Sequence, residues 1–296
     1  METASNHRQP RSAAKAEGGR PPPGPVHWLI EFVGESGSGK SWLARKLTEH
    51  LRTASAVSCA VLGPDDLRTD RKGSRGVAMR SRLKDLRRLA GLALDRRFRS
   101  LLSERFGARR LPNKASIRYI LDMFIKHGRL AERLRRQSRQ TLAILDEGFM
   151  TSAGYMFNPD PTLTADRQER LLNAIARVTG PDYANLRKLY VVVRCGDLDV
   201  LLDRVRRRRQ DSVYAHLARE EAKCLHKKAE EMLATIVEFL RRTNQDYVVI
   251  ENGAKTGDDL ECFRRIQEML EAEIVRSEEV AGPTCTQRPS RNAAEA

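Results

Sequence analysis

Short apolar runs alternate along the chain with longer segments in which apolar residues recur every three or four positions. A continuous apolar run is typical of a strand buried on both faces, and the longer spacing is typical of an amphipathic helix. Strands that alternate with helices form parallel sheets with right-handed crossovers. The pattern therefore predicts an α/β fold with a five-stranded parallel sheet, its strands at residues 26–33, 56–62, 141–145, 189–193 and 247–250.

The segments between these strands predict the helices that flank the sheet. One helix follows the first strand and runs to about residue 53, and others cover about residues 165–178, 197–209, 214–243 and 258–276. Two more amphipathic helices are inserted between the second and third strands, at about residues 68–139. Their apolar positions include Leu94, Phe98, Ala131 and Leu134. We expect these elements to form one domain, residues 26–276.

Both ends of the chain are polar and lack the spacing of a folded element. Residues 1–25 contain three consecutive prolines and scattered arginines, and residues 277–296 include a Gly-Pro break, so we expect two disordered tails. No apolar run approaches the ~20 residues that cross a bilayer. The five cysteines are far apart and indicate neither a zinc site nor a disulfide framework, which fits a cytoplasmic protein.

One stretch after the first predicted strand matches the phosphate-binding loop G-x-x-x-x-G-K-[ST] in full, and a predicted helix follows it, as the motif requires. Glycines let the backbone wrap around a phosphate, and the helix adds its positive dipole end. We expect Lys40 to face solvent without nucleotide and to reach the β- and γ-phosphates of ATP, and Ser41 to ligate Mg²⁺. The alternative is a glycine turn with a chance Lys-Ser. The predicted nucleotide-binding residues are Gly34, Glu35, Ser36, Gly37, Ser38, Gly39, Lys40 and Ser41.

Two acidic residues follow the third predicted strand. Asp146 closes this strand about 105 residues after Lys40, where a phosphate-loop protein places the carboxylate that holds Mg²⁺. The alternative role for Asp146 is the N-cap of a helix. The neighbouring Glu147 either activates water, as in ATPases, or orients the acceptor or the metal shell, as in a kinase.

A second acidic turn follows the second predicted strand, on the wall that faces the loop. Asp65 is a candidate base for the proton of an acceptor hydroxyl, and Arg68 is a candidate ligand of an acceptor anion. The alternative is an Asp-Asp turn that caps a helix.

A run of arginines follows the fourth predicted strand. Arg204 and Arg208 lie four residues apart on one helix face, and we expect a lid at about residues 204–212 that closes over the triphosphate and neutralises charge during transfer. The alternatives are a solvated basic helix face and a nucleic-acid patch.

These motifs resemble the nucleotide- and nucleoside-kinase branch of the P-loop proteins. Residues 202–208 resemble the lid segment of thymidylate kinases, and Asp146 stands where that family has its Asp-Arg pair, with Glu147 in place of the arginine. Residues 62–68 are similar to the acceptor segment of adenylylsulfate kinases, which implies their acidic role for Asp65 and their arginine role for Arg68. The resemblance covers the strand ends within residues 26–276 and leaves out the inserted basic helices.

The positive charge of the chain is concentrated in the insertion. Residues 68–139 contain 23 Lys or Arg and 6 Asp or Glu, an excess of 17 positive charges in a chain of net charge +15. Such a field favours an anionic partner, either nucleic acid or a membrane surface, although a solvated helix face has the same composition. Phe98 and Phe124 fall on apolar faces, so any contact with nucleic acid would involve only its backbone.

The sequence thus favours an ATP- and Mg²⁺-dependent kinase that phosphorylates a small, anionic acceptor such as a nucleotide or a phosphorylated or sulfated metabolite. One alternative is an ATPase that uses Asp146 and Glu147. Another is a nucleic-acid-binding protein or polynucleotide kinase, suggested by the basic insertion.

Overall fold

The computed structural model describes a central sheet, its flanking helices and parts of the insertion. The described residues are 27–53, 60–64, 66, 90–91, 94–96, 98–100, 125–134, 136–137, 139–148, 150, 166, 169–170, 172–174, 186–207, 213–253 and 259–281. The expected N-terminal tail, residues 1–25, lies outside them.

Five parallel strands form one sheet in the order β2-β3-β1-β4-β5. This confirms the predicted sheet, and β3 has the expected bounds. The strands are β1 (His27–Gly34), β2 (Ala60–Leu62), β3 (Thr141–Leu145), β4 (Leu186–Arg194) and β5 (Asp246–Glu251). β1 lies at the centre with all eight of its residues buried, as its apolar run predicts.

The register of the sheet brings three strand ends together. Glu31 of β1 pairs with Leu145 of β3, and Gly34 of β1 pairs with Val193 of β4. The segments that follow β3, β1 and β4 therefore begin side by side at the carboxyl edge of the sheet, where ligands of open α/β sheets bind.

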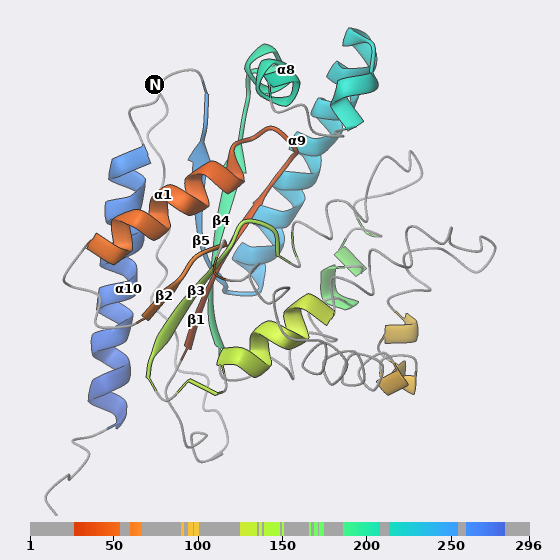
Figure 1. Ribbon diagram of the computed structural model, residues 1–296. Coiled ribbons are helices and arrows are strands. Elements are labelled where there is room, and N and C mark those ends of the chain that lie inside the picture. The colour runs from red at the N-terminus through yellow and green to blue at the C-terminus, as the bar shows by residue number, and fades with distance from the viewer. Residues whose placement is uncertain are drawn as a thin grey trace, which may run out of the picture.

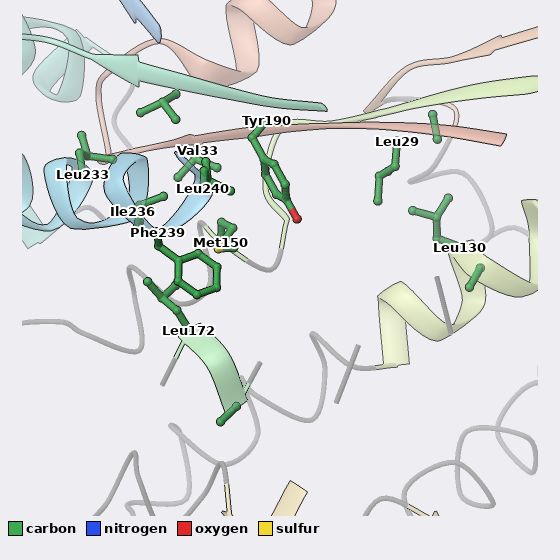
Figure 2. Close-up of a cluster of buried hydrophobic side chains, with 14 of the residues drawn as sticks. Leu29, Val33, Leu130, Met150, Leu172, Tyr190, Leu233, Ile236, Phe239 and Leu240 are labelled. Carbon is green, nitrogen blue, oxygen red and sulfur yellow. The ribbon is translucent and has the colours of Figure 1, made fainter. Parts of the chain in front are cut away.

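Helices cover both faces of the sheet (Figure 1). On one face lie α1 (Lys40–Thr53) and α10 (Asp259–Ala281), which bury leucines of α1 and Phe263 and Leu270 of α10 against β1, β3 and β4. On the other face lie α9 (Arg219–Arg242) and the helical residues 125–134. Figure 2 shows this second core, in which Val33 of the sheet lies beside Leu240 of α9, whereas Leu29 lies toward Leu130.

The inserted segment joins this second core. Phe98, Leu130, Ala131 and Leu134 are buried against the sheet, as the helical spacing predicts. Leu94 differs from the prediction, because its side chain is 79% exposed. The helix does not break at Asp95, because the Asp95 N–H donates to the Gly91 carbonyl and the Asp95 carbonyl accepts from the Arg99 N–H, as in a regular helix. Phe98 reaches the core, whereas Leu94, four residues earlier, does not.

Other elements differ from the predicted bounds at their ends. The helix expected at residues 214–243 divides into a 3-10 helix, η3 (Val213–His216), and α9, which begins at Arg219 because the Glu221 carboxylate accepts the Ala218 N–H at 2.9 Å. α8 (Leu198–Arg207) begins where Asp197 accepts the N–H groups of the first turn. α10 continues to Ala281 and so includes five residues, 277–281, that the sequence pattern assigned to the C-terminal tail.

Within the described ranges, no helix combines the length and the apolar character that crossing a membrane needs.

The two inserted leucines give a test of how the insertion packs. Leu134→Ala removes a side chain with 0% exposure and should lower the free energy of unfolding by about 2–5 kcal/mol. Leu94→Ala, at an exposed position, should change it by less than about 0.5 kcal/mol. Urea unfolding followed by circular dichroism measures both, and equal losses would contradict the packing of residues 125–134 on the sheet.

Candidate functional site

The predicted phosphate-binding loop connects the end of β1 to the first residue of α1. Gly37 and Gly39 have φ angles of +87° and +96°, a region that side chains rarely adopt. A Cβ on Gly39 would also overlap with the Asn252 amide. The first turn of α1 contains no acidic residue, so its positive dipole end faces the loop without a neutralising carboxylate. This conformation and this charge suit an anion.

Lys40 lies back over the loop instead of facing solvent. Its side chain donates hydrogen bonds of 2.7 Å to the carbonyl oxygens of both Gly34 and Glu35, and the residue is 6% exposed. The expectation that Lys40 faces solvent is therefore wrong. The two carbonyls at the end of β1 point toward the ammonium group and satisfy it, so Lys40 also stabilises the loop.

One predicted metal ligand lies in the first turn of α1, and the other follows the end of the strand next to β1. Ser41 occupies the first turn of α1 and is partly buried, and Asp146 directly follows β3, the strand paired with β1. Asp146 is 9% exposed, whereas Glu147 beside it is exposed to solvent. The loop and Asp146 therefore belong to one edge of the sheet, as predicted.

Glu31 is a buried carboxylate in β1 that sequence reasoning passed over. It is 2% exposed and accepts a hydrogen bond from the Met150 N–H, so it holds the segment that follows Asp146. Burial raises the pKa of the neighbouring Tyr190, and the Glu31 charge raises it further. Burial lowers the pKa of Lys188, and Glu31 opposes this shift. The sequence did carry a signal for this site, namely a glutamate within a run whose other residues, apart from His27, are apolar or glycine.

The turn after β2 is held by the second of its two aspartates. Asp66 accepts a 2.7 Å hydrogen bond from the Gly63 N–H and pairs with the Arg52 guanidinium. Arg133 of the insertion donates to the Asp66 carbonyl at 3.1 Å. Asp66 thus has a structural role in the turn. The candidate base Asp65 and the candidate anion ligand Arg68 lie outside the described residues, as does Arg208 of the predicted lid.

Arg204 contacts the turn after β5. Its guanidinium donates to the Asn252 carbonyl at 3.0 Å, to the Asn252 side-chain oxygen at 3.2 Å and to the Gly253 carbonyl at 3.0 Å. Asn252, which the sequence did not single out, is 6% exposed and donates its own amide N–H to the Ser38 carbonyl at 2.7 Å. Asn252 therefore connects the glycine loop, α8 and the turn after β5.

The side chain of Glu35 is turned toward η3 and α9. One oxygen accepts a 2.6 Å hydrogen bond from the Tyr214 hydroxyl, and the other lies 2.9 Å from His226 Nδ1. The hydrogen bond with Glu35 raises the pKa of His226, and burial opposes this shift. Glu35 therefore enters the predicted nucleotide site through its backbone and anchors the loop through its side chain.

Residues 26–100 match the model of the adenylylsulphate kinase family. The matched segment includes the glycine loop, α1 and the turn after β2, and it covers about a quarter of the chain. The P-loop kinase resemblance expected from the sequence is confirmed, and the match supports a phosphotransferase. No curated protein is significantly similar to the chain in sequence.

Several solved structures of kinases resemble the chain at low identity. The deoxyadenosine kinase from M. mycoides with bound dCTP is 10% identical with a TM-score of 0.40, covering 81% of this chain and 99% of that one. The thymidylate kinase from Candida albicans is 13% identical with a TM-score of 0.42, covering 84% and 92%. The shikimate kinase from Acinetobacter baumannii is 14% identical with a TM-score of 0.33, covering 84% and 95%. Similarity of this size does not identify a substrate.

The contact between Glu31 and the segment after Asp146 can be tested at Gly148. A Cβ on Gly148 would overlap with the Glu31 carboxyl group, which is buried and held by Met150, so Gly148→Ala should cost about 1–3 kcal/mol of stability. At Gly196 a Cβ would meet nothing within 4 Å, so Gly196→Ala serves as the matched control with little expected change. Equal unfolding midpoints in urea for the two variants would show that Glu31 does not restrain this segment.

Proposed function

We propose that this P-loop kinase-like protein is an ATP- and Mg²⁺-dependent kinase that transfers the γ-phosphate to a small, anionic acceptor. The observation that carries the proposal is the complete glycine loop at the end of β1, with Lys40 inside it and Asp146 at the end of the adjacent strand β3. The adenylylsulphate kinase match over residues 26–100 supports it.

The glycine loop is the proposed site of the ATP phosphates. Gly37 and Gly39 have backbone angles that suit a close wrap around an anion, and α1 presents its N-terminus to the same place. Lys40, already inside the loop, is proposed to contact the β- and γ-phosphates. The Ser38 hydroxyl is buried and has no hydrogen-bond partner among the described residues, which suits a polar ligand in this loop.

Ser41 and Asp146 are the proposed Mg²⁺ ligands. A hydroxyl and a carboxylate are the oxygen donors that Mg²⁺ prefers, and both residues lie at the carboxyl edge of the sheet. The bound ion would neutralise charge on the β- and γ-phosphates. Asp146 is nearly buried and follows a strand with four fully buried residues, so it would be held in place before the ligand arrives.

The acceptor is proposed to bind at the turn after β2. The Asp66 carboxylate is already bound by the Gly63 N–H and the Arg52 guanidinium, so the neighbouring Asp65 is the better candidate for the base. In the proposed reaction Asp65 takes the proton of an acceptor hydroxyl, and the oxygen of that hydroxyl bonds to the γ-phosphorus of ATP. The bond between the γ-phosphorus and the oxygen that bridges it to the β-phosphorus breaks, and ADP leaves. Arg68 and Glu147 are proposed to orient the acceptor.

Two arginines are proposed to have different roles at the predicted lid. The guanidinium of Arg204 is engaged by the turn at Asn252 and Gly253, which favours a positioning role for this residue. Arg208, four residues further along the chain, is then the proposed contact to the phosphates during transfer.

Lys40→Ala tests the nucleotide site. Loss of the ammonium group should lower the rate of phosphoryl transfer by about 100-fold or more. The variant should also lose about 1 kcal/mol of stability, because the carbonyls of Gly34 and Glu35 lose their donor. Transfer from ATP labelled at the γ-phosphate and the urea midpoint measure the two effects. Lys46→Ala, in the exposed part of α1, is the control and should keep the wild-type transfer rate and urea midpoint. A Lys40→Ala variant with full transfer activity would refute the nucleotide site.

The acceptor must be identified by a screen before the residues proposed to bind it can be tested kinetically. Phosphorylated sugars, nucleosides and sulfated nucleotides are added with ATP and Mg²⁺, and thermal stability and ADP release are recorded. A ligand at 100 times its dissociation constant adds about 2.7 kcal/mol of stability, which a thermal shift detects.

An ATPase is the second candidate function, because the exposed Glu147 beside Asp146 could activate water. Variants of Asp65 and Glu147 distinguish this ATPase from the kinase. If the protein is a kinase, Asp65→Asn should abolish acceptor phosphorylation and spare slow background hydrolysis, while Glu147→Gln should weaken acceptor binding without abolishing that hydrolysis. ADP release with and without acceptor measures this. The opposite pattern, in which Glu147→Gln abolishes hydrolysis and Asp65→Asn has little effect, would identify an ATPase.

A further inference from the structure

Three side chains converge beside the glycine loop, and none of them belongs to Ser41 or Asp146, the proposed Mg²⁺ ligands. One is the side chain of Glu35, which enters the predicted nucleotide site only through its backbone. Glu35, His226 and Glu230 each place one possible metal-ligand atom so that these atoms all lie within 4.8 Å of one another. Their side chains are 4%, 12% and 20% exposed, respectively. His226 and Glu230 are four residues apart on α9, so both project from the same face of that helix.

Neighbouring groups fix the orientation of all three side chains. The Tyr214 hydroxyl donates to Glu35 Oε2 at 2.6 Å, and Arg194 Nε donates to Glu230 Oε2 at 2.9 Å. The Glu35 carboxylate holds the His226 ring, with Glu35 Oε1 lying 2.9 Å from His226 Nδ1. Metal ligands are commonly held by hydrogen bonds of this kind, which orient the atoms that coordinate the ion.

The hydrogen bonds within the cluster leave one buried carboxylate oxygen unsatisfied. His226 Nδ1 lies 2.9 Å from Glu35 Oε1, so the imidazole satisfies that oxygen. Glu230 Oε1 is buried and has no hydrogen-bond partner among the residues that the structure describes. A buried carboxylate oxygen without a partner is costly, and Arg194 engages only its companion oxygen, Oε2. A cation bound between the three side chains would satisfy Glu230 Oε1 and join both glutamates to His226.

We propose that Glu35, His226 and Glu230 form a binding site for one divalent transition-metal ion, of which Zn²⁺ is the representative. One imidazole nitrogen and two carboxylate oxygens are a donor set that Zn²⁺ accepts, whereas Mg²⁺ prefers oxygen ligands alone. The ion would join the second residue of the glycine loop to α9. This site is separate from Ser41 and Asp146 and does not depend on the proposed kinase activity.

The test uses the full-length protein after chelator treatment, with Zn²⁺ alone and without nucleotide. Isothermal titration should show one Zn²⁺ per chain, and the melting temperature should rise with added Zn²⁺. His226→Gln and Glu230→Gln should each weaken the affinity at least 10-fold. Glu230→Gln retains an oxygen that can accept the Arg194 hydrogen bond, so this variant is expected to fold.

Two control variants on α9 distinguish this site from incidental binding. Glu231→Gln changes an exposed glutamate beside Glu230, and Cys224→Ser removes an exposed thiol two residues before His226. Both should bind Zn²⁺ as the wild type does, and X-ray absorption should show nitrogen and oxygen ligands without sulfur. The proposal is overturned if the wild type binds no Zn²⁺, or if Glu230→Gln and His226→Gln both bind Zn²⁺ as tightly as the wild type does. It is also overturned if Cys224→Ser is the variant that abolishes binding. None of these readouts measures phosphoryl transfer, so the kinase proposal stands or fails separately.

Discussion

The parallel pairing of β1 with β3 on one side and β4 on the other is the interaction on which the rest of the structure depends. β1 is buried along its whole length, so its register is fixed by side chains packed on both faces. Because of that register, the glycine loop begins beside the end of β4 and beside the end of β3, which lies 111 residues further along the chain. A slip by one residue would exchange the two faces of β1 and separate the loop from Asp146.

The sheet could be predicted from the sequence because its signal is local. Continuous apolar runs and a complete loop motif lie within a few residues of one another, and no distant partner is needed to recognise them. Helix boundaries were less predictable. Tyr214 and Leu217 continue the apolar spacing of α9, yet the Tyr214 side chain binds Glu35 and the helix begins only at Arg219. Likewise, the apolar spacing includes Leu94, although its side chain is exposed in the folded protein.

The polar contacts of the site were the least predictable part, because each joins residues far apart in the chain. The Asn252 amide and the Ser38 carbonyl are 214 positions apart, and Glu35 and His226 are 191 positions apart. A sequence pattern shows that an asparagine or a glutamate is present but not which group will face it after folding. Lys40 illustrates the same limit: the motif identifies the residue, while its hydrogen bonds to Gly34 and Glu35 come from the curvature of the folded loop.

Glu31 limits which substitutions evolution can accept in the central strand. A carboxylate inside the central strand costs desolvation free energy, and an apolar side chain of similar size would often make such an interior more stable. Such a residue could not accept the Met150 N–H, so the chain after Asp146 would lose its attachment to β1. Selection for heat resistance and selection for an ordered carboxyl edge therefore act in opposite directions at this one position.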